Sequence, residues 1–132
     1  MLDIVPLVED DSLRSTETGC EVRLRLKWYR SLPLSCIELL QVTLDDQPVN
    51  PDLIRLSVNG HTYQLKELTD LVEEFWFVQD AAILSIQHAG IVKRGESHKI
   101  GAELALRFPY IPIGPGKFLT HIRNYSAVQV AS

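Results

Sequence analysis

The side chains that most often carry out chemistry are few in this sequence, and they are not clustered. Histidines stand at positions 61, 88, 98 and 121, and none lies three or four residues from another, the spacing of a helical metal site. We expect His61 on the buried face of a strand and His88, His98 and His121 in loops. No Cys-x-x-Cys occurs either. The sequence therefore predicts that this chain binds no metal or cofactor of its own.

The candidate nucleophiles, carboxylates and glycines lead to the same prediction. The residues that flank Ser35-Cys36 do not form the strained turn of a nucleophile elbow, and entry into a strand accounts for both. Asp45-Asp46 and Glu73-Glu74 are neighbours in the sequence rather than converging pairs, which suits turns and helix ends. Gly114-Pro115-Gly116 has a proline where a phosphate cradle needs a free N–H group. We predict no catalytic residue in this chain.

Two proline-stiffened segments rich in aromatic side chains carry the stronger signal. They are Trp28-Tyr29-Arg30-Ser-Leu-Pro-Leu-Ser35 and Phe108-Pro-Tyr-Ile-Pro-Ile113. Trp, Tyr and Arg dominate binding hot spots, and a rigid loop loses little entropy when it docks, so we favour an interface with a partner. The alternative is that Leu32, Leu34, Ile111 and Ile113 fold back onto their own core. The predicted interface residues are Trp28, Tyr29, Arg30, Leu32, Pro33, Leu34, Ser35, Pro109, Tyr110, Ile111 and Pro112.

Strong strand patterns precede both segments. From Cys20 to Trp28 every even position is apolar and the odd positions are charged or aromatic, which predicts a strand with one buried face and one wet face. Residues 98–108 repeat the pattern and also end in prolines. Between them, Asn59-Gly60 predicts a type I′ hairpin that pairs Val58 with His61, Leu56 with Tyr63 and Ile54 with Leu65.

The remaining elements complete an all-β pattern. Further strands are expected at 2–8, 37–44, 74–78, 81–87 and 127–130, with one or two turns of helix at 66–74. No helix of crossover length separates the strands, which disfavours a parallel α/β fold. We predict a single domain over residues 1–132, an antiparallel β-sandwich of about eight short strands with at most one short helix.

Composition and charge exclude several classes of partner. With 132 residues the chain can bury a core without disulfides or metal. A net charge of −4, without a cluster of Lys or Arg, argues against nucleic acid. No apolar run approaches the roughly 20 residues of a membrane span, and the N-terminus lacks the features of a secretory signal, so no membrane partner is expected. Cys20 and Cys36 are therefore predicted to be reduced and buried, in a cytoplasmic protein.

Several of these segments resemble the beta subunit of bacterial C-glycoside deglycosidases. The resemblance rests on Glu9-Asp-Asp-Ser-Leu-Arg14, on Trp28–Ser35 with Ile37-Glu38, on Asn59-Gly60-x-x-Tyr63-x-Leu65, on Trp76 with Asp80-Ala81, and on Arg107–Pro112. The segments occur in matching order from about residue 9 to residue 113, and the run from Tyr29 to Ser35 is the most specific. The resemblance does not include the tail beyond Gly116.

The resemblance implies a function that composition and spacing do not show. Enzymes of this family are complexes of a TIM-barrel alpha subunit and a β-sandwich beta subunit. They cleave the C–C bond between the anomeric carbon and an aromatic aglycone after the sugar has been oxidised to its 3-keto form. A divalent metal, manganese or similar, would be held by the alpha subunit. This chain would then stabilise or cap the barrel, with Arg30 and Tyr29 in contact with the partner.

A second hypothesis comes from another functional class. The chain could be a free-standing β-sandwich that binds a carbohydrate or an aromatic ligand through Trp28, Tyr29, Trp76 and Tyr110. An isolated subunit with an exposed apolar surface should self-associate, whereas a binding module should be monodisperse, so size-exclusion behaviour separates the two hypotheses.

Overall fold

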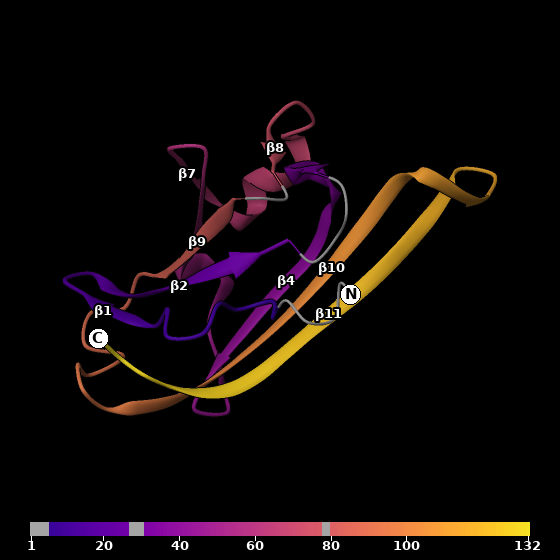
Figure 1. Ribbon diagram of the computed structural model, residues 1–132. Helices are drawn as coiled ribbons and strands as arrows, with labels where there is room; N and C mark the ends of the chain where they lie inside the picture. Colours follow the sequence, from indigo (N-terminus) through magenta and orange to yellow (C-terminus); the bar gives the residue numbers. More distant parts are fainter. Residues whose placement is uncertain (1–5, 27–30, 78–79) are drawn as a thin grey trace.

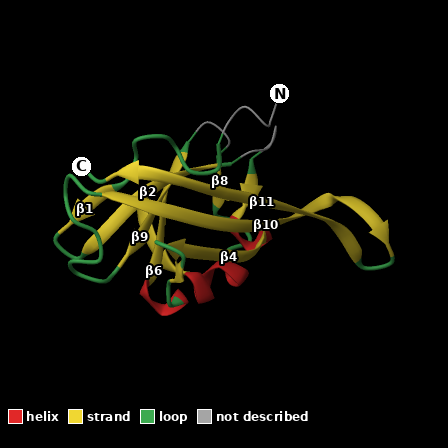
Figure 2. Ribbon diagram, turned by 90° about the horizontal axis from the view of Figure 1, so that it is seen from below, coloured by secondary structure: helices red, strands yellow, loops and turns green. Residues whose placement is uncertain are grey.

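The computed structural model describes residues 6–26, 31–77 and 80–132, and these residues form an all-β fold. Two antiparallel sheets pack against each other (Figures 1 and 2), and the core contains buried side chains from both. The five-stranded sheet has the order β1 (Arg14–Thr16), β2 (Gly19–Arg25), β9 (Ala81–Ile86), β6 (Ile54–Val58), β7 (His61–Gln64). The four-stranded sheet has the order β11 (Lys117–Val130), β10 (Ser97–Gly114), β4 (Ile37–Leu44), β5 (Gln47–Pro48).

Short elements complete the structure. A two-stranded sheet pairs β3 (Leu32–Pro33) with β8 (Phe75–Trp76), and three 3₁₀ turns are η2 (Leu34–Cys36), η3 (Pro51–Leu53) and η4 (Leu65–Asp70). The expected helix at 66–74 is therefore the shorter η4, which begins with a capping box between Gln64 and Glu67. The all-β prediction is confirmed, although the described residues form eleven strands whose lengths range from two to eighteen residues. None of the described helices is both long and apolar enough to span a membrane.

Strand β2 shows the alternation that the sequence predicts. Cys20, Val22, Leu24 and Leu26 are buried, while Arg23 is exposed on the opposite face. The strand ends at Arg25, so the described Leu26 lies beyond it, and the last two residues of the expected strand, 27 and 28, lie outside the described part of the chain. The expected strand at 2–8 is reduced, in its described part, to one bridge between Val8 and Leu24.

The β6–β7 hairpin has the expected turn and register. Asn59 and Gly60 both have positive φ, as a type I′ turn requires, and Val58 pairs with His61 and Leu56 with Tyr63. Leu65 does not pair with Ile54, because η4 begins there.

The prediction that His61 is buried is wrong. Its side chain is 68% exposed and lies 3.7 Å from Glu74. Strand β7 is the edge strand of its sheet, and the turn end of an edge strand lacks the cover that its central neighbours receive.

The largest departure from the sequence-based fold is the β10–β11 hairpin. Strand β11 begins at Lys117, ten residues before the expected start at Ala127, and pairs with β10 from Ser97↔Val130 to Gly114↔Lys117. β4 pairs with β10 only between Ile100 and Leu106, so beyond Leu106 the hairpin continues as a two-stranded ribbon. This ribbon stands clear of the sandwich in Figure 2. We call residues 107–120 the arm.

Candidate functional site

The first proline segment is hydrogen-bonded to the η4–β8 region. Leu32 pairs with Trp76 across β3–β8, the Leu34 N–H donates to the Glu74 carbonyl (2.8 Å), and the Ser35 N–H donates to the Leu71 carbonyl (3.1 Å). These bonds turn Leu32 and Leu34 inward, where their exposed fractions are 2% and 0%, and Ser35 is buried as well. The expectation that Leu32, Leu34 and Ser35 present an exposed surface is therefore wrong, and the fold-back alternative holds for both leucines.

The first proline segment also contains residues that are partly exposed. Pro33 is half-buried and Ser31 is half-buried beside it. Trp28, Tyr29 and Arg30 lie outside the described residues. Their predicted role in an interface stays a prediction.

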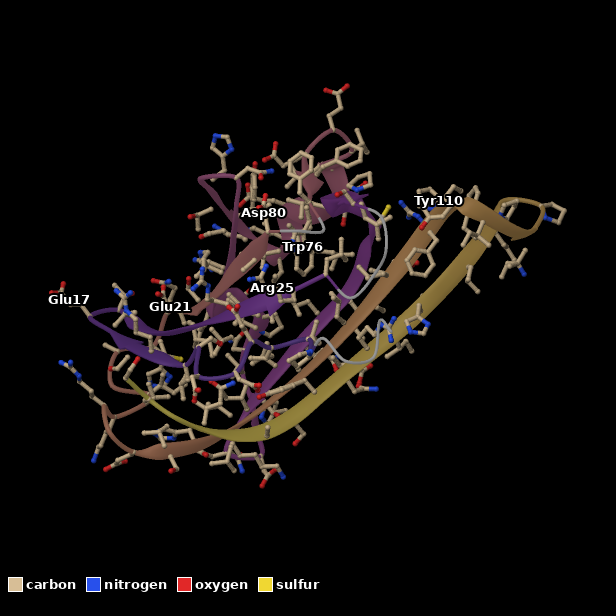
Figure 3. All side chains as sticks on the ribbon, in the orientation of Figure 1. Glu17, Glu21, Arg25, Trp76, Asp80 and Tyr110 are labelled. Atoms are coloured by element: carbon tan, nitrogen blue, oxygen red, sulfur yellow. The ribbon has the colours of Figure 1, made fainter. Side chains whose placement is uncertain are left out.

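The second segment lies at the start of the arm, and part of it is exposed to solvent. Pro109 and Pro112 are exposed, whereas Tyr110 and Ile111 are half-buried and pack against the core cluster. The rings of Tyr110 and the buried Phe108 are 6.2 Å apart. Tyr110 is labelled at the arm in Figure 3. The four predicted interface residues of this segment are thus still accessible to a partner in part.

The structure brings the two proline segments together. A guanidinium nitrogen of Arg107, which precedes the second segment, donates to the carbonyl oxygen of Ser35 at 3.5 Å. The sequence pattern did not predict this neighbourhood, because the two residues are 72 positions apart in the chain. Together the segments form one end of the molecule, which is the candidate interaction site.

The structure removes Trp76 from the ligand-binding hypothesis. Its side chain is 1% exposed, and its indole N–H donates to the Asp80 carbonyl at 3.0 Å. Figure 3 shows it inside the fold rather than at a surface. A buried indole cannot stack on a ligand, so one of the four proposed aromatic contacts is excluded.

Two groups of exposed apolar side chains lie mostly outside the predicted interface. One is on the arm, where Ile113, Phe118 and Leu119 are exposed, and the other follows η4, where Val72, Phe75 and Phe77 are exposed. Large apolar side chains that gather on the surface of a folded protein indicate an interaction site. In the sequence, Ile113 ends the second proline segment, whereas the aromatic Glu74–Val78 run is interpreted as an ordinary strand.

A shallow polar hollow lies on the outer face of the four-stranded sheet. It has a volume of about 380 Å³, and its floor is Gly101, where a Cβ atom would collide with the Thr43 hydroxyl. Glu103 pairs in register with Gln41 on one side and Asn124 on the other, so amide and carboxylate groups form one row. The hollow offers hydrogen bonds to a polar partner, and Tyr125 is the one aromatic residue among those that line it.

The two thiols are buried and reduced, as predicted. Cys20 and Cys36 are both free and both buried. Burial, assisted by the charge of Glu21, raises the pKa of the Cys20 thiol to about 11. Burial also raises the pKa of Cys36, although Arg107 partly opposes the shift. Because the thiolate is the nucleophile, neither side chain is activated for covalent chemistry.

The histidines lie in different elements and do not gather into one site. His98 is buried in β10 and His121 lies in β11, so the expectation that both are loop residues is wrong; His88 does lie in a loop. His98 Nδ1 hydrogen-bonds to Asp45 at 2.8 Å, and its Nε2 accepts the Lys93 N–H at 3.3 Å. Within the described ranges no three His, Cys, Asp or Glu side chains are grouped so that they could hold a metal ion.

Asp45 joins the turn after β4 to the start of β10. Its carboxylate accepts hydrogen bonds from His98 and from the Lys99 N–H (2.9 Å). The bond from His98, and then the bond from Lys99, hold the pKa of the Asp45 carboxyl below its ordinary value of 3.8. A carboxylate with a lowered pKa in the folded state stabilises that state above the unfolded pKa and loses this contribution as the pH falls through the folded pKa.

Asp45→Asn is therefore expected to lower stability near neutral pH and to reduce the loss of stability on acidification below about pH 4. The effect should be modest, because the Asp45 side chain is half exposed and solvent screens it. Urea unfolding at several pH values between about 3 and 7 measures it. Asp46→Asn is the matched control, since Asp46 also has positive φ but forms only a surface ion pair with Lys99. Parallel pH profiles for the two variants would contradict the prediction.

The fold and the site together define a class of protein: an all-β protein of two packed antiparallel sheets with exposed apolar side chains on a projecting hairpin. The chain belongs to the C-glycoside deglycosidase beta subunit family, whose sequence model matches residues 6–110. It is 38% identical to the 3′-dehydrocarminate deglycosidase beta subunit of a Microbacterium species over 107 residues, which cover 81% of this chain and 80% of the relative.

Other relatives support the same family. A C-glycoside deglycosidase beta subunit of Microbacterium trichothecenolyticum is 33% identical over 107 residues, 81% of this chain and 80% of its own. One from Arthrobacter globiformis is 33% identical over 119 residues, 90% of this chain and 88% of its own. The family match ends at Tyr110, so most of the arm and all of β11 lie beyond it.

Proposed function

We propose that this chain is the small subunit of a heteromeric, metal-dependent C-glycoside deglycosidase and that it stabilises or caps a TIM-barrel alpha subunit. The family match over residues 6–110 is the observation that carries the proposal. The relatives are named beta subunits, which implies a partner subunit. We assign the catalytic groups to the alpha subunit, and the working location of the complex to the cytoplasm.

The proposed substrate is a 3-keto-C-glycoside of an aromatic aglycone. The keto group acidifies the adjacent C–H bond, so a base can remove that proton. The C–C bond to the aglycone then breaks as the aglycone carbon takes up a proton, and the aglycone and a keto sugar are released. The name of the Microbacterium relative specifies a 3′-dehydro substrate, which agrees with a keto sugar.

A divalent metal, manganese or similar, is proposed to be held by the alpha subunit, where it would stabilise the negative charge that develops when the proton leaves. The described residues of this chain do not fit such an ion, because they contain no group of three suitable ligands. No step is therefore assigned to a metal on this chain.

The alpha subunit is proposed to bind the end of the sandwich at which the two proline segments meet. Prolines fix the backbone at this end, so little conformational entropy is lost on docking. Because Leu32, Leu34 and Ser35 are buried, their proposed role is to support the surface from below rather than to touch the partner. The proposed contacts are Trp28, Tyr29 and Arg30, together with Pro109, Tyr110, Ile111 and Pro112.

Co-expression with a barrel-forming candidate from a neighbouring reading frame tests the proposal. The complex should cleave a 3-keto-C-glycoside, whereas this chain alone should leave the substrate unchanged. Arg30→Ala is expected to raise the Kd between the subunits by about tenfold or more, because arginine is frequent among hot-spot residues. Isothermal titration calorimetry measures the affinity.

Arg94→Ala is the control. Arg94 is an exposed arginine in the turn before β10, at the end of that strand far from Pro109 and Pro112. Its affinity for the alpha subunit should equal that of the unchanged chain. Turnover by this chain alone, or no association with a barrel subunit, would refute the proposed function. Equal affinities for the two arginine variants would refute the proposed place of the interface.

A further inference from the structure

The tip of the arm is apolar and positively charged. Ile113, Phe118 and Leu119 are exposed large apolar side chains, and Lys117 is exposed among them. We call these four residues the arm tip. From residue 104 to residue 132 the sequence has Arg107, Lys117 and Arg123 but no Asp or Glu. All seventeen acidic residues of the chain precede this stretch.

A second exposed surface has the opposite charge. Val72 is 63% exposed, and the exposed rings of Phe75 and Phe77 stack with their centroids 6.4 Å apart. Asp70 and Glu73 are exposed beside them, and neither carboxylate forms a hydrogen bond or an ion pair with the described residues. We call these five residues the acidic patch. Between residues 67 and 92 the sequence has five carboxylates and no Lys or Arg.

The outer part of the arm lacks support from the described part of the sandwich, whereas its inner residues Phe108, Tyr110 and Ile111 belong to the core or pack against it. A two-stranded ribbon is marginally stable in water, and beyond Leu106 the described strands give β10 no neighbour except β11. The exposed edge of β11 and the apolar side chains along it are features that soluble proteins cover. The Gly114-Pro115-Gly116 turn, in which Gly116 has positive φ, holds the tip in a fixed shape.

The positions of the two surfaces allow them to pair between two copies. Figure 1 shows the tip of the arm and the β8 region at the same end of the molecule but well apart from each other. A contact between the arm tip of one copy and the η4–β8 region of a second copy would repeat itself about a twofold axis through that end. The contact is then made twice and the assembly closes as a dimer.

We propose that the arm tip of this chain binds the acidic patch of a second copy, so that two beta subunits form a twofold dimer. Both partners of the contact are present in one sequence, with apolar side chains in each and opposite charges around them. Apolar contact supplies the affinity, and the charges select the orientation. The inference goes beyond the proposed function and does not depend on it. The alpha subunit is assigned to residues 28–30 and 109–112, and the second copy to the arm tip and the acidic patch.

A charge exchange tests the dimer with the full chain. The unchanged protein should sediment as a dimer at micromolar concentration, and about 1 M salt should weaken it because salt screens the charges. Lys117→Glu and Glu73→Lys alone should each raise the dimer Kd by about tenfold or more, since both copies of the contact then oppose like charges. An equimolar mixture of the two variants should dimerise again, because each contact of the mixed pair joins a cation to a carboxylate.

Analytical ultracentrifugation and native mass spectrometry of the mixture measure the result. Arg94→Glu is the control charge reversal away from both surfaces and should leave the dimer intact. Circular dichroism should show that all variants are folded, because the changed side chains are exposed. In a complex with the alpha subunit, the unchanged chain should be present in two copies per assembly, and Lys117→Glu should leave the affinity for the alpha subunit unaltered.

Three outcomes would overturn the dimer. They are a monomer at all concentrations, a dimer that neither single variant weakens, and a mixture that fails to recover. If the Lys117→Glu variant failed to bind the alpha subunit but still dimerised, the arm tip would be assigned to the alpha subunit instead. Arg30→Ala separates this proposal from the proposed function, because it should release the alpha subunit and retain the dimer.

Discussion

Leu32→Asp is expected to unfold the chain rather than to remove a single contact at its surface. Leu32 lies in β3 opposite Trp76, and only 2% of it is exposed to solvent. A carboxylate at this position would be buried without a described cation or donor placed to pair with it, at a cost of several kcal/mol. The whole free energy of folding of a domain of this size is about 5–15 kcal/mol. Urea unfolding followed by tryptophan fluorescence measures the loss.

Two further variants separate charge burial from the loss of packing. Leu32→Ala should cost about 2–5 kcal/mol through the cavity that it leaves, and the chain should still fold. Val128→Asp makes a comparable change at a strand position that is 64% exposed, and it should leave stability nearly unchanged. A stable Leu32→Asp variant that fails only to bind a partner would show that Leu32 belongs to an interface and not to the core. If the variant is unfolded, its failure to bind a partner does not assign Leu32 to an interface.

Gly19→Ala is expected to destabilise the chain by about 3 kcal/mol, which corresponds to a fall in Tm of about 10 °C. A Cβ atom at Gly19 would lie 1.8 Å from the carbonyl oxygen of Ile86 and 2.8 Å from the backbone nitrogen of His88. These are main-chain atoms at the end of β9, which pairs with β2 through Cys20 and Ile86, so the sheet itself would have to move. Gly19 also has a φ of +156°, which L side chains rarely adopt.

Gly60→Ala provides the comparison. Gly60 also has positive φ, but no atom lies within 4 Å of its added Cβ, so only the conformational cost of about 1–2 kcal/mol applies. Calorimetric melting of both variants measures the difference between them. If Gly19→Ala and Gly60→Ala had equal Tm values, the close approach of β2 and β9 at Gly19 would be disproved.

Alternating patterns in the sequence correctly predicted the strands in the middle of each sheet. The inward side chains of two inner strands are buried: Cys20, Val22 and Leu24 in β2, and Ile100, Leu104 and Leu106 in β10. Both strands have a paired strand on each side, and their inner faces contribute to the common core. The Asn59-Gly60 turn specified its own hairpin, since only residues that tolerate positive φ suit both central positions. These are local properties, and the sequence contains all of them.

Strand β11 was largely missed because its pattern is opposite to that of a half-buried strand. Its apolar side chains Ile122, Val128 and Val130 point to solvent, while the polar Arg123 and Gln129 face inward. Gln129 is buried because its amide accepts the N–H groups of Ser12 and Leu13 and donates to Glu9 and Tyr125. Three of these partners, Glu9, Ser12 and Leu13, are more than a hundred residues away in the chain, so no local window contains them.

The candidate site divides in the same way. The sequence by itself determined the proline segments, the reduced thiols and the family to which the chain belongs. The tertiary structure decided that Leu32, Leu34 and Trp76 are buried, that His98 binds Asp45, and that an apolar arm projects from the sandwich. The physical reason is that side-chain periodicity fixes which residues share a face, whereas burial of that face depends on which distant segment packs against it.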